Sequence, residues 1–138
     1  MAEAKERAAE IFEQGHNCAQ AVFAAFAEEL GIDEELALKI ASSFGGGISG
    51  TRETCGAITG MLMASGVGFG YIHPKGREEK NVLNEKLQSM MKEFTDVYKT
   101  VNCGELLKLG EEQKIEKPCV EYVKLAASIA EHKIAEYK

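Results

Sequence analysis

The sequence has no tryptophan, only two prolines and fewer basic than acidic residues. Lysine and arginine together number 16 against 22 aspartates and glutamates, so the 138-residue chain carries a net charge of −6 at neutral pH. A surface of that sign repels a phosphate backbone, which argues against a general nucleic-acid-binding protein. Because proline is scarce and 45% of the residues are hydrophobic, the composition favours one helical globular domain.

An apolar leader is also lacking, since the first residues read Met-Ala-Glu-Ala-Lys-Glu-Arg and contain no hydrophobic run of the kind that directs secretion. The chain has only four cysteines, far below the density of a small secreted scaffold held together by disulfides. We therefore expect a cytoplasmic protein. In that reducing compartment cysteines serve as metal ligands, redox groups or buried side chains rather than as permanent disulfides.

One long stretch, residues 54–72, lacks charge altogether. Its 19 residues are long enough to cross a membrane, but five of them are glycine and three are serine or threonine. We therefore expect no membrane insertion, and interpret the stretch as the central helix of a small bundle. Gly56, Gly60 and Ala64 recur every four residues and would form a ridge of small side chains that a neighbouring backbone can approach closely.

Apolar residues repeat at three- and four-residue spacing along most of the chain, which predicts amphipathic helices. No segment shows the sustained alternation of a β-strand, and the connections between helical segments are short. We therefore expect an all-α fold, a single-domain bundle of about six or seven helices. The predicted helices cover residues 3–14, 18–30, 33–44, about 51–66, a segment around 83–97, 103–109 and 118–137.

The four cysteines, Cys18, Cys55, Cys103 and Cys119, each fall at or near a predicted helix N-terminus. Free backbone N–H groups and the positive end of the helix dipole stabilise a thiolate there, so we expect lowered thiol pKa values. If the helix starts meet at one end of the bundle, the four sulfurs form one site. No CxxC pair occurs, so the pattern differs from zinc-ribbon and thioredoxin motifs.

Three classes of function are compatible with this pattern. The first is a redox protein whose four thiolates ligate an iron–sulfur cluster or another metal centre for electron transfer. The second is a metal-free dithiol/disulfide oxidoreductase in which Cys55 exchanges with another cysteine. The third is a non-enzymatic helical binding module whose cysteines are simply buried. Four cysteines at helix starts favour the first class, because a dithiol needs only two; whether the protein is an enzyme is left open.

The surroundings of Cys55 carry a more specific pattern. Residues 54–60 read Thr-Cys-Gly-Ala-Ile-Thr-Gly and contain CGAxxG, with Asn17-Cys18 upstream and Cys103 and Cys119 downstream. This arrangement resembles the redox-active protein family that is written C_GCAxxG_C_C after its cysteines. All four family cysteines have counterparts here, and the resemblance covers nearly the whole chain. It implies one domain of this type over residues 1–138, with the four cysteines as redox-active thiols and as ligands of any metal or cofactor.

The resemblance also has implications for cofactors and partners. A related module in split-Soret cytochromes is associated with an iron–sulfur centre, so a cluster held by some or all of the four thiolates is expected, with zinc or no metal as alternatives. Covalent c-type haem is excluded because the chain has no CxxCH. Family members are often encoded near transporters, which implies a functional link to a membrane transporter beside an unknown redox partner. A homodimer is left open.

Three further features carry weaker signals. Residues 45–50 contain GxGxxG, but a helix precedes them where a dinucleotide-binding fold needs a strand, so that fold is not expected. Their glycines would instead bring the loop close to Cys55 or form an anion-binding nest. His16 could ligate a metal, although a capping or surface role is favoured. Arg52 and Glu53 could tune the thiolates, although an ion pair that solvates the helix start is favoured.

Overall fold

Residues 3–137 are described by a computed structural model. Over that range the chain forms eight α-helices, one short 3-10 helix and no β-strand, so the predicted all-α fold is confirmed. The elements are α1 (Ala4–Glu13), α2 (Cys18–Ala24), α3 (Ala27–Leu30), α4 (Glu34–Ala41), the 3-10 helix η1 (Ser42–Phe44), α5 (Gly56–Phe69), α6 (Arg77–Tyr98), α7 (Cys103–Glu112) and α8 (Pro118–Glu136).

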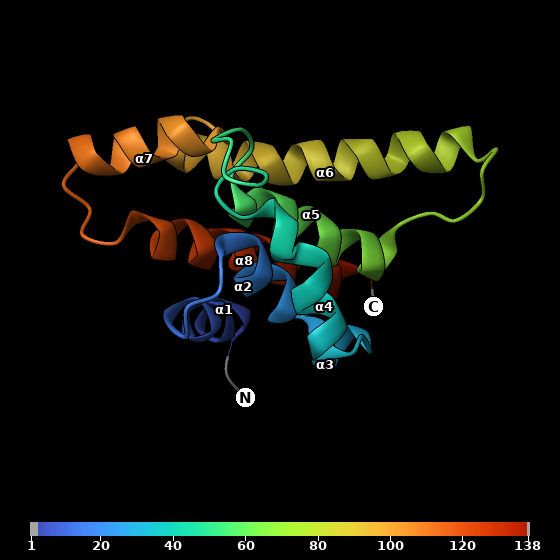
Figure 1. The fold of residues 1–138 in the computed structure, drawn as a ribbon. Coiled ribbons are helices and arrows are strands. Elements are labelled where there is room, and N and C mark those ends of the chain that lie inside the picture. Colours follow the sequence, from blue (N-terminus) through green and yellow to red (C-terminus); the bar gives the residue numbers. More distant parts are fainter. Residues whose placement is uncertain (1–2, 138) are drawn as a thin grey trace.

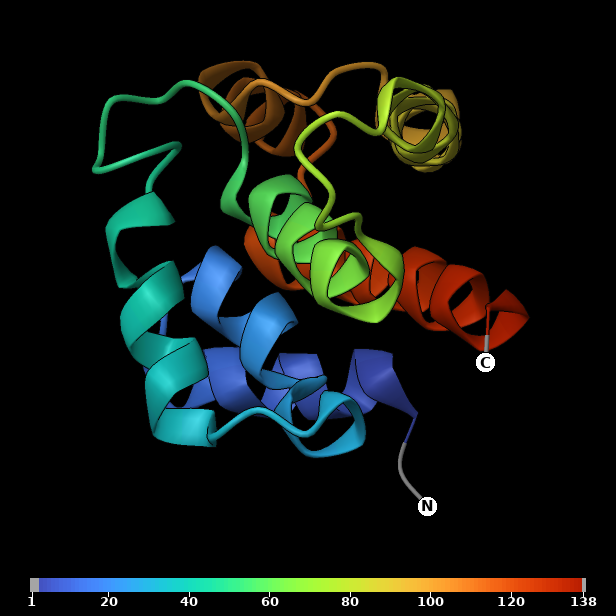
Figure 2. The same ribbon diagram turned by 90° about the vertical axis from the view of Figure 1, so that its right-hand side faces the viewer.

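The helices are arranged in three layers. Figures 1 and 2 show α5 and α8 in the middle, with α1 to α4 on one side and α6 and α7 on the other. Helix α5 packs against α2 and α8, and α8 also packs against α1 and α6. The core between the layers contains Phe26, Ile58 and Tyr122, which are almost completely shielded from solvent. The buried residues of α5 and α8 therefore lie between the two outer layers.

The segment predicted as one helix over residues 18–30 is divided into α2 and α3, so the structure has more helices than the six or seven expected. At the break, the side chain of Arg7 donates a hydrogen bond from Nε to the carbonyl oxygen of Ala25 over 3.0 Å. Phe26 has φ −103° and ψ 0°, outside the helical range. A contact from α1 thus accompanies the interruption of a helix that the local sequence would continue.

The predicted start of the uncharged helix near residue 51 is wrong, because α5 begins at Gly56 and extends to Phe69. The preceding residues are extended and pair with the segment before α7. Thr54 forms an isolated antiparallel bridge with Asn102, and the Cys55 N–H donates to the carbonyl of Val101 over 2.7 Å. Long-range hydrogen bonds therefore replace the first helical turn that the sequence pattern suggested.

The two glycines of the CGAxxG motif bring α5 unusually close to α2. A Cβ atom added at Gly56 would lie 2.9 Å from the backbone nitrogen of Ala19, and one at Gly60 would lie 2.8 Å from its carbonyl oxygen. Both distances are shorter than ordinary van der Waals contact, so a side chain at either position would push the helices apart. Ala64, one turn further on, is completely buried.

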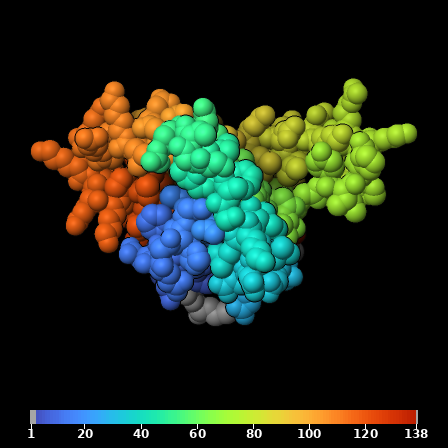
Figure 3. Space-filling model, in the orientation of Figure 1, coloured from blue at the N-terminus to red at the C-terminus, as the bar shows by residue number. Residues whose placement is uncertain are grey.

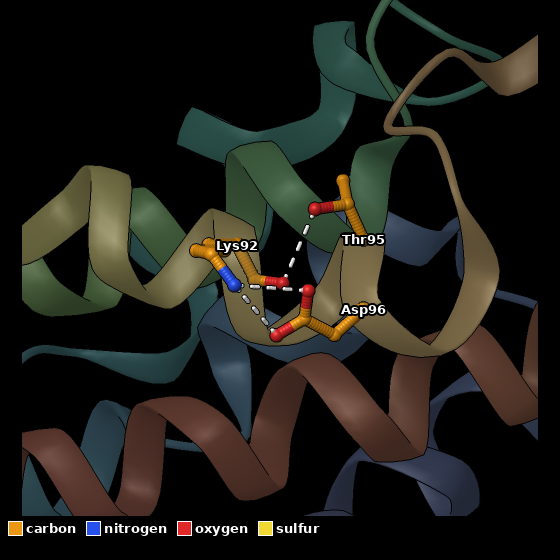
Figure 4. Close-up of polar contacts among 3 residues, drawn as sticks. All are labelled: Lys92, Thr95 and Asp96. Carbon is orange, nitrogen blue, oxygen red and sulfur yellow. Dashed lines mark hydrogen bonds and ion pairs between the residues drawn. The ribbon is translucent and has the colours of Figure 1, made fainter.

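Helix α6 is the longest helix of the described chain and presents a charged surface along much of its length. Figure 4 shows one exposed turn, where Lys92 lies 3.1 Å from Asp96 and the Thr95 hydroxyl donates to the Lys92 carbonyl. An exposed pair at this spacing stabilises a helix by a few tenths of a kcal/mol, about 0.3–0.5. Within residues 3–137 no helix combines the length and apolar character needed to cross a membrane.

We predict that Gly60→Ala destabilises the protein by about 1–3 kcal/mol, and that Gly60→Leu destabilises it more, because each side chain overpacks the contact with α2. The free energy of unfolding, measured by urea denaturation of the reduced protein, tests this. Gly66→Ala is the matched control, since a Cβ there meets nothing within 4 Å in the same helix. It should leave stability unchanged or raise it by up to about 1 kcal/mol. Equal effects of the two alanines would contradict the close α2–α5 packing.

Candidate functional site

The four cysteines stand at the starts of four different helices. Cys18 is the first residue of α2 and Cys103 the first of α7, whereas Cys119 follows Pro118 in the first turn of α8. Cys55 is the N-cap of α5. All four are free thiols in the structure. The sequence-based placement at helix N-termini is therefore confirmed for each of them.

These helix starts meet at one cavity of about 200 Å³, which all four cysteines line. The remaining lining comes from apolar side chains, from Asn17 and Arg52, and from backbone at three glycines. Phe12, Leu106, Leu107 and Tyr122 are the apolar contributors. Among residues 3–137 no group of three or more His, Cys, Asp or Glu side chains is arranged to hold a metal ion. The cavity thus assembles four thiols without forming a tight single-ion site.

Asn17 fixes the start of α2 and therefore the position of Cys18. Its side-chain oxygen accepts a hydrogen bond from the Gln20 backbone N–H over 2.9 Å, and the Gln20 side chain accepts one from the Asn17 N–H over 3.0 Å. This reciprocal capping box satisfies N–H groups that a helix start otherwise leaves free. The Asn17 amide also donates to the carbonyl of Ser42, which ties the start of α2 to the end of the α4 region.

A second asparagine performs the same task at Cys103. The Asn102 side chain accepts a hydrogen bond from the Glu105 N–H over 2.9 Å and caps α7. The backbone around it pairs with the residues before α5, because the Cys103 N–H donates to the Glu53 carbonyl over 2.5 Å. Together with the hydrogen bond from the Cys55 N–H to Val101, this pairing holds the starts of α5 and α7 side by side.

The glycine-rich loop over residues 45–53 covers one side of the cavity. A Cβ at Gly47 would lie 2.6 Å from the Cβ of Cys103. The sequence suggested that the glycines of this loop approach Cys55, whereas Gly47 approaches Cys103. The N–H groups of residues 48–53 all donate to carbonyl groups within the segment 43–48. Those donors are already used, so the N–H groups of residues 48–53 are not available to an anion. The anion-binding nest expected from the glycines as a whole stays a prediction. In Figure 3 the loop is the green projection at the top of the view, and Figure 2 shows it on the side of α7 that faces away from α6.

Cys18 and Cys119 form a hydrogen-bonded thiol pair. This bond lowers the pKa of Cys119 to about 7, and the positive charge of Arg52 contributes in the same direction, whereas partial burial opposes it. The same bond, together with burial and the neighbouring thiolates, raises the pKa of Cys18. The two thiols therefore ionise as a coupled pair, in which the shifts favour the thiolate on Cys119.

The pKa of Cys55 is raised, whereas its position at a helix start predicted a lowered value. Burial raises its pKa to about 11, although the N–H groups of Ala57 and Ile58 favour the thiolate. Nearby Tyr122 is similarly affected, because burial and the Cys119 charge raise its pKa to about 12. The prediction of a lowered pKa is thus right in direction for Cys119, although the hydrogen bond with Cys18 is its main cause. It is wrong for Cys18, whose pKa the same bond raises, and for Cys55, where desolvation outweighs the N–H groups of the helix start.

Arg52 lies at the cavity, contrary to the favoured interpretation of an ion pair with Glu53. Its Nη1 atom donates to the sulfur of Cys103 over 3.8 Å. The residue has a positive φ of 63°, and its N–H donates to the Gly46 carbonyl. The folded loop therefore aims the guanidinium at the thiols. His16 does not line this cavity, so the structure gives no support to its use as a ligand.

Several residues that line the cavity are not identified by the positions of the cysteines alone. Tyr122 follows Cys119 by three positions, and Leu106 and Leu107 follow Cys103 by three and four. Helical spacing would have identified them, because residues three or four apart share a helix face. The Tyr122 hydroxyl donates to the Leu106 carbonyl over 2.5 Å, which joins α8 to α7 beside the cavity. Phe12 comes from α1 and had no comparable signal.

The fold and cavity define an all-α protein with a four-cysteine site. The chain belongs to the family described as "Putative redox-active protein (C_GCAxxG_C_C)", whose profile matches residues 16–133. A protein of Archaeoglobus fulgidus, described as an uncharacterized protein, is 30% identical over 135 residues. That match covers 91% of this chain and 89% of the archaeal protein. No solved structure matches the sequence.

We predict that alkylation of the reduced, metal-free protein distinguishes Cys119 from Cys55 by pH. Only thiolates react, so Cys119 should become reactive as the pH rises through about 7, whereas Cys55 should stay slow until the pH approaches about 11. Iodoacetamide labelling from pH 5 to pH 10, read by peptide mass spectrometry, measures the Cys119 midpoint and shows whether Cys55 stays slow across that range. Cys18→Ala removes the hydrogen bond to Cys119 and should move the Cys119 midpoint upward. An unchanged midpoint in that variant would contradict the thiol pair.

Proposed function

We propose that the protein is a redox protein whose four cysteines hold an iron–sulfur cluster in the shared cavity and that it transfers electrons. The observation that carries the proposal is the convergence of Cys18, Cys55, Cys103 and Cys119 on one cavity. A dithiol requires two of these residues, whereas a cluster commonly uses four thiolates. The family description as a redox-active protein supports the same class of chemistry.

The residues at the cavity fit such a cluster in type and in available space. Thiolates are the ligands that iron–sulfur clusters prefer, and no carboxylate or imidazole lines the cavity in the described chain. Its volume of about 200 Å³ accommodates a group of several atoms rather than one ion. A single zinc ion would require all four sulfurs within about 2.3 Å of it, which favours the cluster over zinc for this more open arrangement.

The protein residues would hold, shield and polarise the cluster, which when bound supplies a one-electron couple. The four thiols would act as ligands from four helix starts, each on a rigid element. The apolar side chains of Phe12, Leu106 and Leu107 would limit the access of water. Arg52 would place a positive charge at the rim. Electrons would enter from one redox partner and leave to another.

The Cys18–Cys119 thiol pair supports a second candidate, a dithiol/disulfide oxidoreductase. In this reaction the Cys119 thiolate attacks one sulfur of a substrate disulfide and releases the first substrate thiolate. Cys18 gives its proton to the released thiolate and attacks the Cys119 sulfur of the mixed disulfide, which breaks the bond from Cys119 to the substrate and releases the second thiolate. Cys18 and Cys119 are then joined by a disulfide, and two electrons have passed to the substrate. This pairing differs from the expected exchange at Cys55.

The cellular setting belongs to the same proposal. Free, partly ionised thiols or an oxygen-sensitive cluster function best in a reducing compartment, so we place the protein in the cytoplasm. The redox partner and the functional link to a transporter follow only from the resemblance. A homodimer stays open and is tested by the mass of the protein in solution.

We predict that protein purified without oxygen contains iron and acid-labile sulfide, and has visible absorption that dithionite bleaches. Iron and sulfide analysis together with absorption spectroscopy measures the content. Substitution of each of Cys18, Cys55, Cys103 and Cys119 by alanine should lower the iron content at least several-fold, because each removes a ligand. His16→Ala is the control and should keep its iron, since His16 does not line the cavity.

Iron-free protein after both anaerobic purification and anaerobic reconstitution would contradict the cluster proposal. Thiol counting then tests the dithiol candidate. Mild oxidation should remove two thiols, and peptide mapping should find Cys18 linked to Cys119. Four thiols that remain free under these conditions would exclude both candidates and leave the helical binding module.

A further inference from the structure

We infer that Arg52 sets the reduction potential of the four-cysteine site by stabilising its reduced form. The inference rests on the proposed function in one respect, namely that the site is redox-active. It does not depend on whether a cluster or a thiol pair carries the electrons. In either chemistry reduction adds negative charge at the sulfurs, and a nearby positive charge favours the more negative state.

The residues that line the cavity identify Arg52 as the positive charge that stabilises the reduced form. Among the described residues that line the cavity, Arg52 is the only one with a side chain that is formally charged at neutral pH, apart from the thiols themselves. No acidic side chain belongs to that lining, although the whole chain carries a net charge of −6. The thiols therefore face one cation inside an otherwise acidic protein.

The contacts of Arg52 place that cation at the sulfurs. Its Nη1 atom lies 3.8 Å from the sulfur of Cys103. Arg52 also lines the same cavity as the other three cysteines, so its charge lies at the wall that the four thiols share.

The backbone at Arg52 is held in a conformation that the residue would not adopt by itself. Its φ of 63° lies in the left-handed region, which is uncommon for residues other than glycine and asparagine. Hydrogen bonds from its N–H to Gly46 and from the Gly104 N–H to its carbonyl keep it there. The loop and the start of α7 therefore hold an arginine at a backbone position that glycine would occupy with less strain.

The test compares midpoint potentials of the purified full-length protein and its variants. Arg52→Gln removes the charge and keeps a side chain on the same strained backbone. Because Arg52 is exposed and water screens its charge, we expect a fall of about fivefold in the equilibrium constant for reduction. That is about 41 mV for a one-electron couple and about 21 mV for a two-electron couple. Arg52→Lys keeps the charge and should remain within about twofold of the parent.

Two further variants separate the charge effect from folding and from net charge. Arg52→Gly relieves the backbone strain and should lower the potential like Arg52→Gln, even if the glutamine variant folds poorly. Arg77→Gln changes the net charge equally at the start of α6, which Figure 1 shows at the end of that helix away from α7. It should shift the equilibrium constant by less than about twofold.

The method that measures the potential depends on whether the protein holds a cluster or a thiol pair. With a cluster, the potential is measured by dye-mediated titration of its absorption; without one, by thiol counting in dithiothreitol buffers. Absence of a cluster refutes the cluster proposal but leaves Arg52 testable on the thiol pair. A parent-like potential in Arg52→Gln and Arg52→Gly, or an equal shift in Arg77→Gln, would overturn the inference.

Discussion

The close approach of α5 to α2 is the constraint on which the cysteine cavity depends. Gly56 and Gly60 face the backbone of Ala19, and a Cβ at either position would collide with it. The same contact brings the starts of the two helices together, since a Cβ at Gly56 would also lie 3.1 Å from the Cβ of Cys18. The glycines of CGAxxG therefore have a packing role, and they allow two of the four thiols to share one cavity.

The other two thiols reach the cavity through contacts between distant segments. The extended pairing before α5 and α7 positions Cys103, and the packing of Gly110 against Pro118 brings α7 to the start of α8. Once assembled, Cys18 and Cys119 ionise as a coupled pair, and their hydrogen bond favours the thiolate on Cys119. Burial opposes ionisation at Cys18, Cys55 and Cys119, whereas helix N–H groups favour it at Cys55 and Arg52 favours it at Cys119. Cys18, Cys55 and Cys119 therefore differ in how readily they ionise.

Local sequence patterns were sufficient for the all-α class and for the helix-start position of each cysteine, because periodicity and capping residues act within a few positions. They failed where a distant segment decides the local structure. Arg7 accompanies the break between α2 and α3, and Val101 contributes to the later start of α5. The thiol pKa values needed the structure for a similar reason, since the helix dipole and burial have opposite signs and only the burial of Cys55 shows which is larger.

The position of the thiols also couples the site to the stability of the fold. Each cysteine lies in the first turn or at the cap of its helix, so a group held by all four would join α2, α5, α7 and α8 at their starts. Such a group would bind the folded state more tightly than the unfolded chain, because only folding brings the four sulfurs together, and would stabilise it by mass action. Helix α7 has most to gain, because its helix packing is mainly against α8 and is supported there by the Tyr122–Leu106 hydrogen bond. Loss of the group would therefore loosen α7 first, and with it Cys103 and the contact to Arg52.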